Sequence, residues 1–178
     1  MKEMEKLEGA AGAKVNIKLL HEKAVIPTRA TKMSVGYDLT IPEAYIVQPG
    51  RNVIKLGFAL EMPYNIEAKI EARSGFSAKG MEGYNIISLE NPEVKEVYYS
   101  RDPHRFDADV LTGKIDPDYR GEVGVIIKNN CPFPFVLREG TRIAQMTFYR
   151  VETAHFAEID KLSCTDRGEG GYGSTDKQ

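Results

Sequence analysis

The chain has 178 residues, which fits one domain of ordinary size better than two. Hydrophobic residues make up 42% and charged residues 28%, values usual for a folded soluble domain. The formal net charge of -2 provides no overall basic field, which argues against a protein that coats nucleic acid. A small pocket for an anion would not show in that total.

The two cysteines, Cys131 and Cys164, form no C-x-x-C motif, so we expect neither a disulfide framework nor a zinc site. Free thiols indicate a reducing compartment, though weakly. No stretch approaches the roughly 20 apolar residues of a membrane span, and residues 1–13 lack the apolar segment of a signal peptide. We expect a cytoplasmic protein without nucleic-acid or membrane partners; a nuclear or viral context is the alternative left open.

Apolar and polar residues alternate along most of the chain, which predicts strands. The expected strands lie at 15–19, 52–60, 66–72, 123–128, 133–137 and 143–148. Turn signals such as Gln48-Pro49-Gly50 separate them. Many short strands at this spacing predict an all-β sandwich or barrel of jelly-roll type. Only residues 74–79 and 1–7 are suited to a short helix.

Two segments depart from the alternation. Residues 90–109 are polar, charged and interrupted by two prolines, which predicts an excursion loop with at most a short strand at 94–99. Residues 167–178 are rich in glycine and almost free of apolar side chains, so burial cannot offset their ordering entropy. The expected organisation is a flexible extension at 1–13, a β domain at 14–160, and a linker with a Gly-rich arm at 161–178.

Arg73-Ser74-Gly75 stands at the end of an expected strand and the start of the short helix. A guanidinium, a hydroxyl and free backbone amides at one point suit a phosphate. The alternative is an ordinary strand-to-turn junction with a surface arginine, and these three residues alone favour it.

Two aspartates occupy turn or strand-start positions. Asp116, in the hairpin 113–121, is placed to hold an attacking water as a general base, and the flanking glycines allow a backbone to approach a ligand. Asp38, in the series GYDL, suits a hydrated Mg²⁺ beside a polyphosphate. For Asp116 the alternative is capping of backbone amides at a tight turn, and the hairpin alone favours it. For Asp38 the alternative is solvation at a strand edge, which four residues support at least as well.

Gln145 lies inside an otherwise apolar strand that begins at Arg142. A polar side chain there needs a partner, so it either satisfies backbone groups or faces a site. The pattern does not separate these two possibilities.

The Gly-rich segment 167–175 allows backbone N–H groups to converge on phosphate oxygens, with an arginine and two hydroxyls nearby. Tyr172 is an aromatic ring able to stack on a base. The alternative is a disordered tail, as most Gly-rich termini are. The segment is not a P-loop, because it has no G-K-[ST] and no helix after it.

The order of these stretches is more specific than any one of them. The series GYDL, ARSG, GKIDPDYRG, GTRIAQ and RGEGGYGST closely resembles the five ordered motifs of the trimeric dUTPases, over residues 15–175. The resemblance implies a distorted jelly roll with one short helix and a homotrimer whose active sites are shared between subunits. It also implies Mg²⁺-dependent cleavage of dUTP to dUMP and pyrophosphate, which limits uracil in DNA and supplies dUMP for dTMP synthesis.

The resemblance assigns roles to single positions. Asp116 is expected to activate a water for in-line attack on the α-phosphorus, and Asp38 to act on the metal through its waters. The residues expected to bind the substrate are Arg73, Ser74, Gly75, Val110, Gly113, Ile115, Tyr119, Gln145, Arg167, Tyr172, Gly173, Ser174 and Thr175.

Within that set, the resemblance implies a separate role for each group of residues. Residues 73–75 and Gln145 are expected to hold the phosphate chain, and the backbone of 110–113 to read the uracil edge. Tyr119 is expected to pack on the deoxyribose and exclude a 2′-hydroxyl. The arm is expected to come from a third subunit and close over the γ-phosphate, with Tyr172 on the uracil.

The chain departs from the family pattern between the second and third motifs, where the span is unusually long and residues 90–109 are interpreted as an insertion. We considered a lid, a partner-binding surface and a tolerated surface loop, and the loop is favoured. Val110 stands where many members have Asn, and Tyr172 where Phe is common.

Three other functions were weighed. A dCTP deaminase resembles this fold but lacks a hydrolytic hairpin of the form Asp116-Pro117-Asp118-Tyr119, and ammonia release would identify it. A binding module without catalysis would bind dUTP and release no pyrophosphate. A structural β protein with a disordered tail is the least specific alternative.

Overall fold

The computed structural model describes residues 12–88 and 98–170. Its elements in chain order are β1 (Asn16–Leu19), β2 (Thr28–Arg29), β3 (Tyr37–Thr40), β4 (Tyr45–Val47), β5 (Gly50–Glu61), β6 (Ile66–Glu71), α1 (Ser74–Lys79), β7 (Met81–Ser88), β8 (Tyr98–Tyr99), β9 (His104–Phe106), β10 (Ala108–Leu111), β11 (Gly113–Ile115), β12 (Glu122–Asn129), β13 (Phe135–Leu137) and β14 (Arg142–Arg150). The predicted all-β class and the short helix at 74–79 are confirmed. The helix considered at 1–7 lies outside the described residues, as do residues 94–97 of the short strand considered at 94–99.

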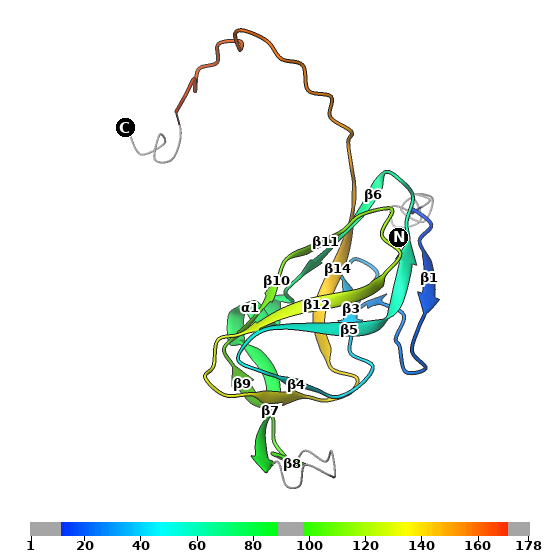
Figure 1. Ribbon diagram of the computed structural model, residues 1–178, viewed down its shortest axis with the longest axis vertical. Coiled ribbons are helices and arrows are strands. Elements are labelled where there is room, and N and C mark those ends of the chain that lie inside the picture. Colours follow the sequence, from blue (N-terminus) through cyan, green and yellow to red (C-terminus); the bar gives the residue numbers. More distant parts are fainter. Residues whose placement is uncertain (1–11, 89–97, 171–178) are drawn as a thin grey trace, which may run out of the picture.

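The strands form three antiparallel sheets that curl around a common interior (Figure 1). One sheet has the order β1-β5-β12-β10, the second β11-β6-β14-β3-β2, and the third β4-β13-β7-β8, with β9 paired to β7. Consecutive strands often belong to different sheets, as in a distorted jelly roll. The second sheet and the edge of the third carry most of the candidate site.

The core takes side chains from all three sheets. Phe58, Leu39 and Phe135, one from each sheet, are fully buried. In β6 the predicted alternation holds, because buried and half-buried residues strictly alternate from Ile66 to Glu71. The expected apolar strands therefore form where their apolar face has a core to cover.

β14 differs from its expected pattern. Ile143 and Ala144 are adjacent in sequence and both fully buried, although strict alternation would place them on opposite faces. A register shift between Arg142 and Ala144 changes the facing of the strand there. Residues on both faces are buried in the middle of β14, where Ile143, Ala144, Met146 and Thr147 are all covered, whereas its last two residues are exposed.

The long span between α1 and the 113–121 hairpin contains more regular structure than a loop. β7 and β9 form an antiparallel ribbon with Glu82 opposite Arg105, and the ribbon projects at the lower end of the body (Figure 1). Phe106 is buried and stacks on Phe135, with ring centroids 4.2 Å apart and an interplanar angle of 8°. The loop predicted to extend to residue 109 therefore ends earlier, because β9 begins at His104. Strands of three and four residues are too short for alternation to reveal them.

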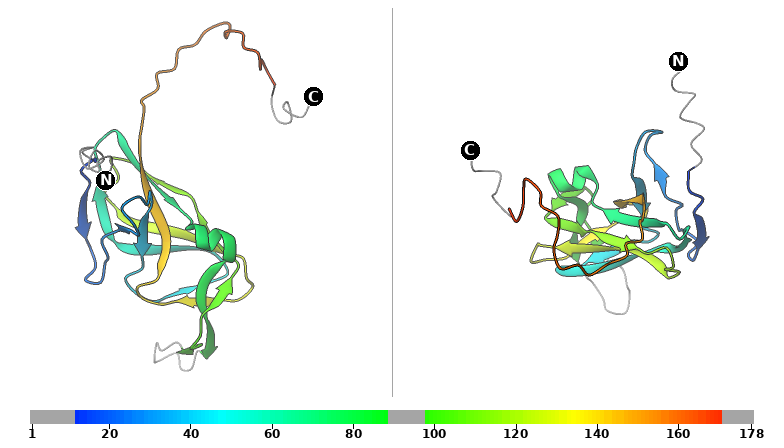
Figure 2. Two further views of the ribbon diagram at one scale, coloured as in Figure 1. Left: turned by 180° about the vertical axis from the view of Figure 1, so that it is seen from behind. Right: turned by 90° about the horizontal axis from the view of Figure 1, so that it is seen from above.

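Beyond β14 the chain leaves the body. Residues 151–170 run as an extended, exposed segment that arches away from the sheets (Figures 1 and 2). A backbone hydrogen bond of 3.0 Å from Val151 to Asn65 marks the last contact of this stretch with the sheets. In the described part of the chain, no helix has the length and apolar character needed to cross a membrane.

Candidate active site

A polar cleft of about 890 Å³ lies where the start of α1 meets β3 and β14. Asp38 from β3, Arg73, Ser74 and Gly75 from the start of α1, and Gln145 from β14 all line it. Pairing of the strands explains the gathering, since Gln145 lies opposite Asp38 on one side and Glu71 on the other. Residues far apart in sequence thus meet at one end of one sheet.

Asp38 joins two arginines. Its Oδ1 is 2.9 Å from Arg73 Nε, and its Oδ2 accepts a hydrogen bond of 3.1 Å from Arg142 Nη1. Arg73 Nη1 also lies 3.4 Å from the carbonyl oxygen of Arg142. The side chain of Asp38 is only 15% exposed, so these pairs form under partial shielding from water and hold both guanidinium groups at the cleft.

Backbone amides face the cleft at the beginning of α1. Arg73, the N-cap residue, has extended dihedral angles and makes no side-chain cap. Its carbonyl accepts hydrogen bonds from the amides of Phe76 and Ser77, while the amides of Ser74 and Gly75 have no partner among the described residues. No atom lies within 4 Å of a Cβ built at Gly75, so an anion has open access to this backbone.

Gln145 has a fixed orientation. Its Nε2 donates a hydrogen bond of 3.1 Å to the carbonyl of Ala72, and its Oε1 lies against Gly36. A Cβ added at Gly36 would overlap that oxygen, so only glycine leaves room for this rotamer. The polar residue in an apolar strand thus satisfies a backbone group and also faces the cleft.

The cleft carries oxygen donors that suit Mg²⁺. Asp38 and Glu71 both line it. Among the described residues no three His, Cys, Asp or Glu side chains gather as a metal cage. Mg²⁺ is usually held by one or two carboxylates together with substrate phosphates and water. The donor set therefore fits a cation that arrives with a polyphosphate. The Glu71 carboxylate accepts a hydrogen bond from Lys69 and raises the pKa of that lysine.

The segment predicted as a hairpin at 113–121 begins with β11, at the far edge of the same sheet, and leads toward β12 in another sheet, so its two arms, both within the described residues, do not pair with each other. Val110 and Ile115 are buried in the core, so their side chains are not available to a ligand and only their backbone is. Gly113, by contrast, has no atom within 4 Å of a built Cβ. This backbone has open space in front of it.

Asp116 and Tyr119 occupy the exposed turn of that hairpin. The Asp116 carbonyl accepts a hydrogen bond from the Tyr119 amide, which closes the turn. The Asp116 carboxylate is exposed and makes no ion pair or hydrogen bond with any residue of 12–88 or 98–170. Tyr119 is 44% exposed, and its hydroxyl donates to the Glu122 carbonyl at 3.2 Å. The carboxylate is free to bind a water.

Asp38 and Asp116 are far apart within one chain. Two strands, β14 and β6, lie between β3 and β11, and Asp116 is displaced along the strands toward Glu67. Strand spacings of about 4.8 Å and rises of about 3.3 Å per residue put the two carboxylates on the order of 20 Å apart. A single chain therefore brings together the cleft residues but not the hairpin residues with them.

Arg167 is placed away from both groups. It lies on the exposed C-terminal segment, where its Nε donates to the Gly170 carbonyl at 3.0 Å. Tyr172, Gly173, Ser174 and Thr175 lie outside the described residues.

Sequence reasoning missed five charged residues that line the cleft. They are Glu71, Lys79, Glu82, Arg105 and Arg142. Arg142 belongs to the fourth motif, so its position beside Gln145 was the available signal. Glu82 and Arg105 come from the β7–β9 ribbon, whose pairing no periodicity revealed.

Comparisons with known proteins identify the family of the chain. The dUTPase family matches residues 22–100 and 105–176. A deoxyuridine 5'-triphosphate nucleotidohydrolase of Nautilia profundicola is 36% identical over 165 residues, covering 92% of this chain and 99% of the relative. One from Yaba monkey tumor virus is 36% identical over 162 residues, covering 90% and 95%.

Solved structures show the same fold. A point mutant of the Staphylococcus bacteriophage 80alpha dUTPase, solved with dUpNHpp, superposes with a TM-score of 0.71 at 24% identity, covering 91% of this chain and 98% of the other. The dUTPase of phage phi11 of S. aureus, described with a species-specific insert, has a TM-score of 0.65 at 21% identity, covering 85% and 99%. The chain belongs to the dUTPase family of enzymes.

Proposed function

We propose that the enzyme hydrolyses dUTP to dUMP and pyrophosphate by in-line attack of a water on the α-phosphorus. The observation that carries this proposal is the cleft, which gathers two arginines, two free amides and a carboxylate at one point. The nucleotidohydrolase names of relatives at 36% identity support the choice of substrate.

The cleft would bind the triphosphate. The guanidinium of Arg73 and the amides of Ser74 and Gly75 donate to phosphate oxygens, and Gln145 adds a further polar group. Attack on a triphosphate depends on positioning and charge neutralisation more than on covalent help, and this donor set supplies both.

Asp38 would hold Mg²⁺ through water molecules, the way in which a single carboxylate commonly binds this ion beside substrate phosphates. The bound ion would neutralise negative charge on the phosphate oxygens. Asp38 is already held between Arg73 and Arg142, so its carboxylate is oriented before the nucleotide enters.

The hairpin would supply the base and the nucleoside pocket. Asp116 takes a proton from the attacking water, a role for which its carboxylate has no competing partner among the described residues. The exposed ring of Tyr119 packs on the deoxyribose and excludes a 2′-hydroxyl. The backbone from Val110 to Gly113 reads the uracil edge, since the Val110 side chain is buried.

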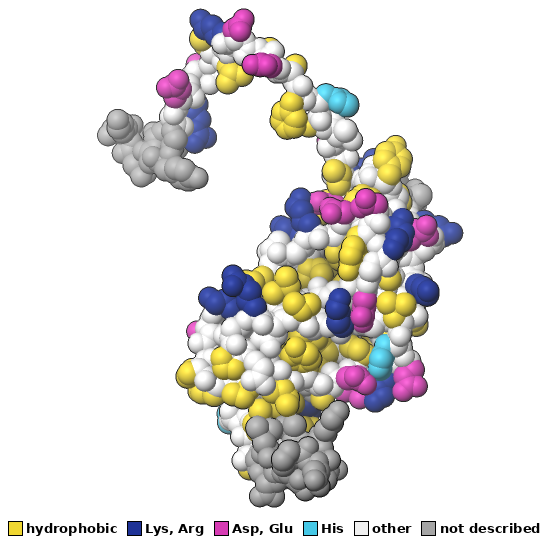
Figure 3. Space-filling view, viewed as in Figure 1, with side chains coloured by type: hydrophobic (Ala, Val, Ile, Leu, Met, Phe, Trp, Pro, Cys, Tyr) yellow, Lys and Arg dark blue, Asp and Glu magenta, His cyan; other side chains and the backbone are white. Residues whose placement is uncertain are grey.

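A homotrimer would unite the two groups, with the hairpin of one subunit facing the cleft of another. Leu111, Ile126 and Val53 form a row across β10, β12 and β5, and Val53 is 54% exposed. Figure 3 shows hydrophobic side chains on the face that carries β5 and β12. An apolar row on an outer sheet face suits burial against another copy.

The C-terminal segment would reach a neighbouring subunit. Phe156 is 99% exposed and Leu162 79% exposed, although both are large apolar side chains. Contact with another subunit would cover them and carry Arg167, Tyr172, Gly173, Ser174 and Thr175 to its nucleotide. There the arginine and hydroxyls close over the γ-phosphate, and the ring of Tyr172 lies on the uracil.

Substrate selection provides the test. The enzyme is incubated with Mg²⁺ and dUTP, dTTP, dCTP or UTP separately, and pyrophosphate and ammonia are both followed. We expect pyrophosphate from dUTP alone. Equal cleavage of all four nucleotides would refute the specificity, and ammonia from dCTP would identify a deaminase instead.

A further inference from the structure

The β7–β9 ribbon forms part of the cleft wall. Glu82 on β7 and Arg105 on β9 are directly opposite in the ribbon, and both line the cleft that holds Asp38 and Arg73. Neither residue belongs to the five motifs, and the proposed reaction has no role for them so far. The cleft thus contains an additional charged pair.

Arg105 lies at the opposite end of α1 from the free amides. Its Nη1 donates to the carbonyl of Gly80 at 3.3 Å, and Gly80 is the C-cap of α1. A helix of six residues spans about 9 Å, so the cleft extends from Ser74 to a second cationic end at Arg105 and Lys79. A phosphate chain anchored at the amides has a positive group to reach toward.

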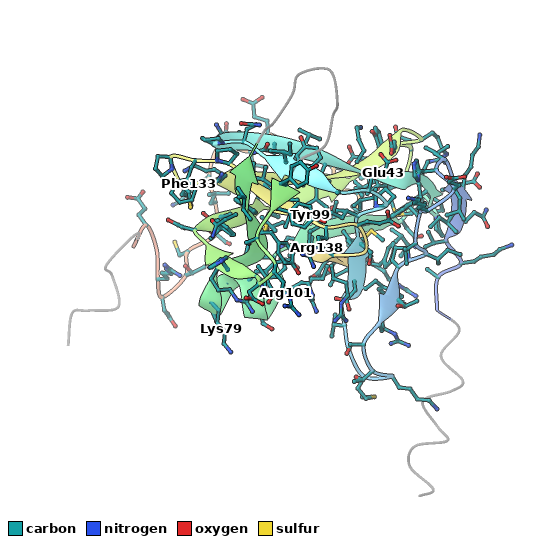
Figure 4. All side chains as sticks on the ribbon, turned by 90° about the horizontal axis from the view of Figure 1, so that it is seen from below. Glu43, Lys79, Tyr99, Arg101, Phe133 and Arg138 are labelled. Atoms are coloured by element: carbon teal, nitrogen blue, oxygen red, sulfur yellow. The ribbon has the colours of Figure 1, made fainter. Side chains whose placement is uncertain are left out.

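The ribbon is docked firmly to the body by Arg138, which follows β13. The guanidinium carbon of Arg138 lies 3.6 Å from the ring centroid of Tyr84 and 4.8 Å from that of Tyr99. Its Nη2 lies 3.5 Å from the carbonyl oxygen of Ser100, and Figure 4 shows Arg138 beside Tyr99. Cation–π contacts on two rings fix the ribbon, so Arg105 projects from a rigid wall.

The Glu82–Arg105 pair is exchangeable. Arg105 Nη2 is 3.0 Å from Glu82 Oε2, but both side chains are 47% exposed. Exposed ion pairs contribute little, whereas an arginine makes stronger bidentate hydrogen bonds to a phosphate. A phosphate group that reaches Arg105 can therefore displace Glu82, whose own negative charge opposes it.

We propose that Arg105 binds the terminal phosphate of the nucleotide and that Glu82 weakens this contact, so that the pair favours a triphosphate over shorter phosphate chains. The proposal rests on the proposed function and names a further substrate-binding residue for it. We expect Arg105 to affect the binding of the nucleotide and not the chemical step, because it lies at the opposite end of α1 from the free amides of Ser74 and Gly75.

Two substitutions of opposite expected effect test the proposal. Arg105→Gln should raise KM for dUTP about three- to tenfold with kcat nearly unchanged, because one charged contact is lost. Glu82→Gln should lower KM, because a repulsive carboxylate is removed and Arg105 is freed. A purely structural ion pair would move both variants in the same direction, together with their Tm, and that result would overturn the proposal.

Arg101→Gln is the matched control, since Arg101 is an exposed arginine near the same ribbon and does not line the cleft. We expect it to keep the wild-type KM. Binding of inorganic tripolyphosphate to the full-length protein, measured by calorimetry, should weaken in Arg105→Gln and not in Arg101→Gln. A wild type that fails to cleave dUTP would refute the proposed function. Normal cleavage with unchanged KM in Arg105→Gln would refute only the role of Arg105.

Discussion

Asp38 orients two of the arginines that line the cleft. Its two carboxylate oxygens are paired with Arg73 and Arg142, which start from different elements. Gln145 depends in the same way on a neighbour, because its amide fits only against a residue without a Cβ at position 36. The chemistry at this scale is set by orientation, and substitutions that keep the fold should still change it.

Asp116→Asn should lower kcat for dUTP by at least about 100-fold, because an amide cannot accept the proton of the attacking water. The exposed carboxylate has no structural partner among the described residues, so Tm should not fall. Turnover is followed as pyrophosphate release, and affinity by titration with a non-hydrolysable dUTP analogue. Near wild-type turnover would exclude Asp116 as the base.

Gly36→Ala should displace the Gln145 amide, since the added Cβ would overlap its Oε1. Loss of a hydrogen bond worth about 1 kcal/mol predicts a KM for dUTP raised roughly fivefold. Gly12→Ala is the control, because no atom of the described residues lies within 4 Å of a Cβ built at that glycine and it does not line the cleft. If Gln145→Ala on its own left KM unchanged, the amide would have no part in binding.

The β7–β9 ribbon and the C-terminal segment are two elements whose positions could not be predicted from the five motifs. The β7–β9 ribbon belongs to the third sheet and adds charge to the cleft. The C-terminal segment leaves the body and exposes apolar side chains such as Phe156. The ribbon contributes Glu82 and Arg105 to the cleft of its own chain, whereas none of residues 151–170 lines that cleft.

Truncation after residue 166 should leave a folded protein with severely reduced turnover, because the removed segment begins beyond the sheets. Circular dichroism and sedimentation would show an unchanged fold and oligomeric state, and KM for dUTP should rise. A truncated protein that unfolds would instead assign the arm a structural role.

The whole molecule has to reconcile two groups of residues on the order of 20 Å apart. In the proposed mechanism the Asp116 carboxylate would reach the cleft of a second copy of the chain, and the apolar row on β5, β12 and β10 is the proposed contact surface. Catalysis and assembly are then inseparable.

Mixed trimers test this directly. Asp116→Asn and Arg73→Ala subunits should each be inactive alone. Refolded together at equal amounts, about a quarter of the sites would combine an intact hairpin with an intact cleft from different chains. Recovery of roughly that fraction of wild-type turnover supports a shared site, and no recovery would indicate that each chain uses its own residues.

Six of the strands (β1, β5, β6, β12, β13 and β14), the helix at 74–79 and the family could be predicted from sequence, because alternation and motif order are local properties. The roles of Asp116, Tyr119 and the arm remain predictions. Pairing partners could not be predicted: nothing local shows that Gln145 lies opposite Asp38, or that the ribbon begins again at His104.

Sequence by itself therefore determined the family and the order of its five motifs, and it predicted which residues carry the chemistry. Only the tertiary structure decided which of them share a site, because strand pairing brings residues 38, 73 and 145 together and leaves the 113–121 hairpin at the far side of the same sheet. It also decided that Arg105 lines the same cleft, since the register of β7 with β9 places it there.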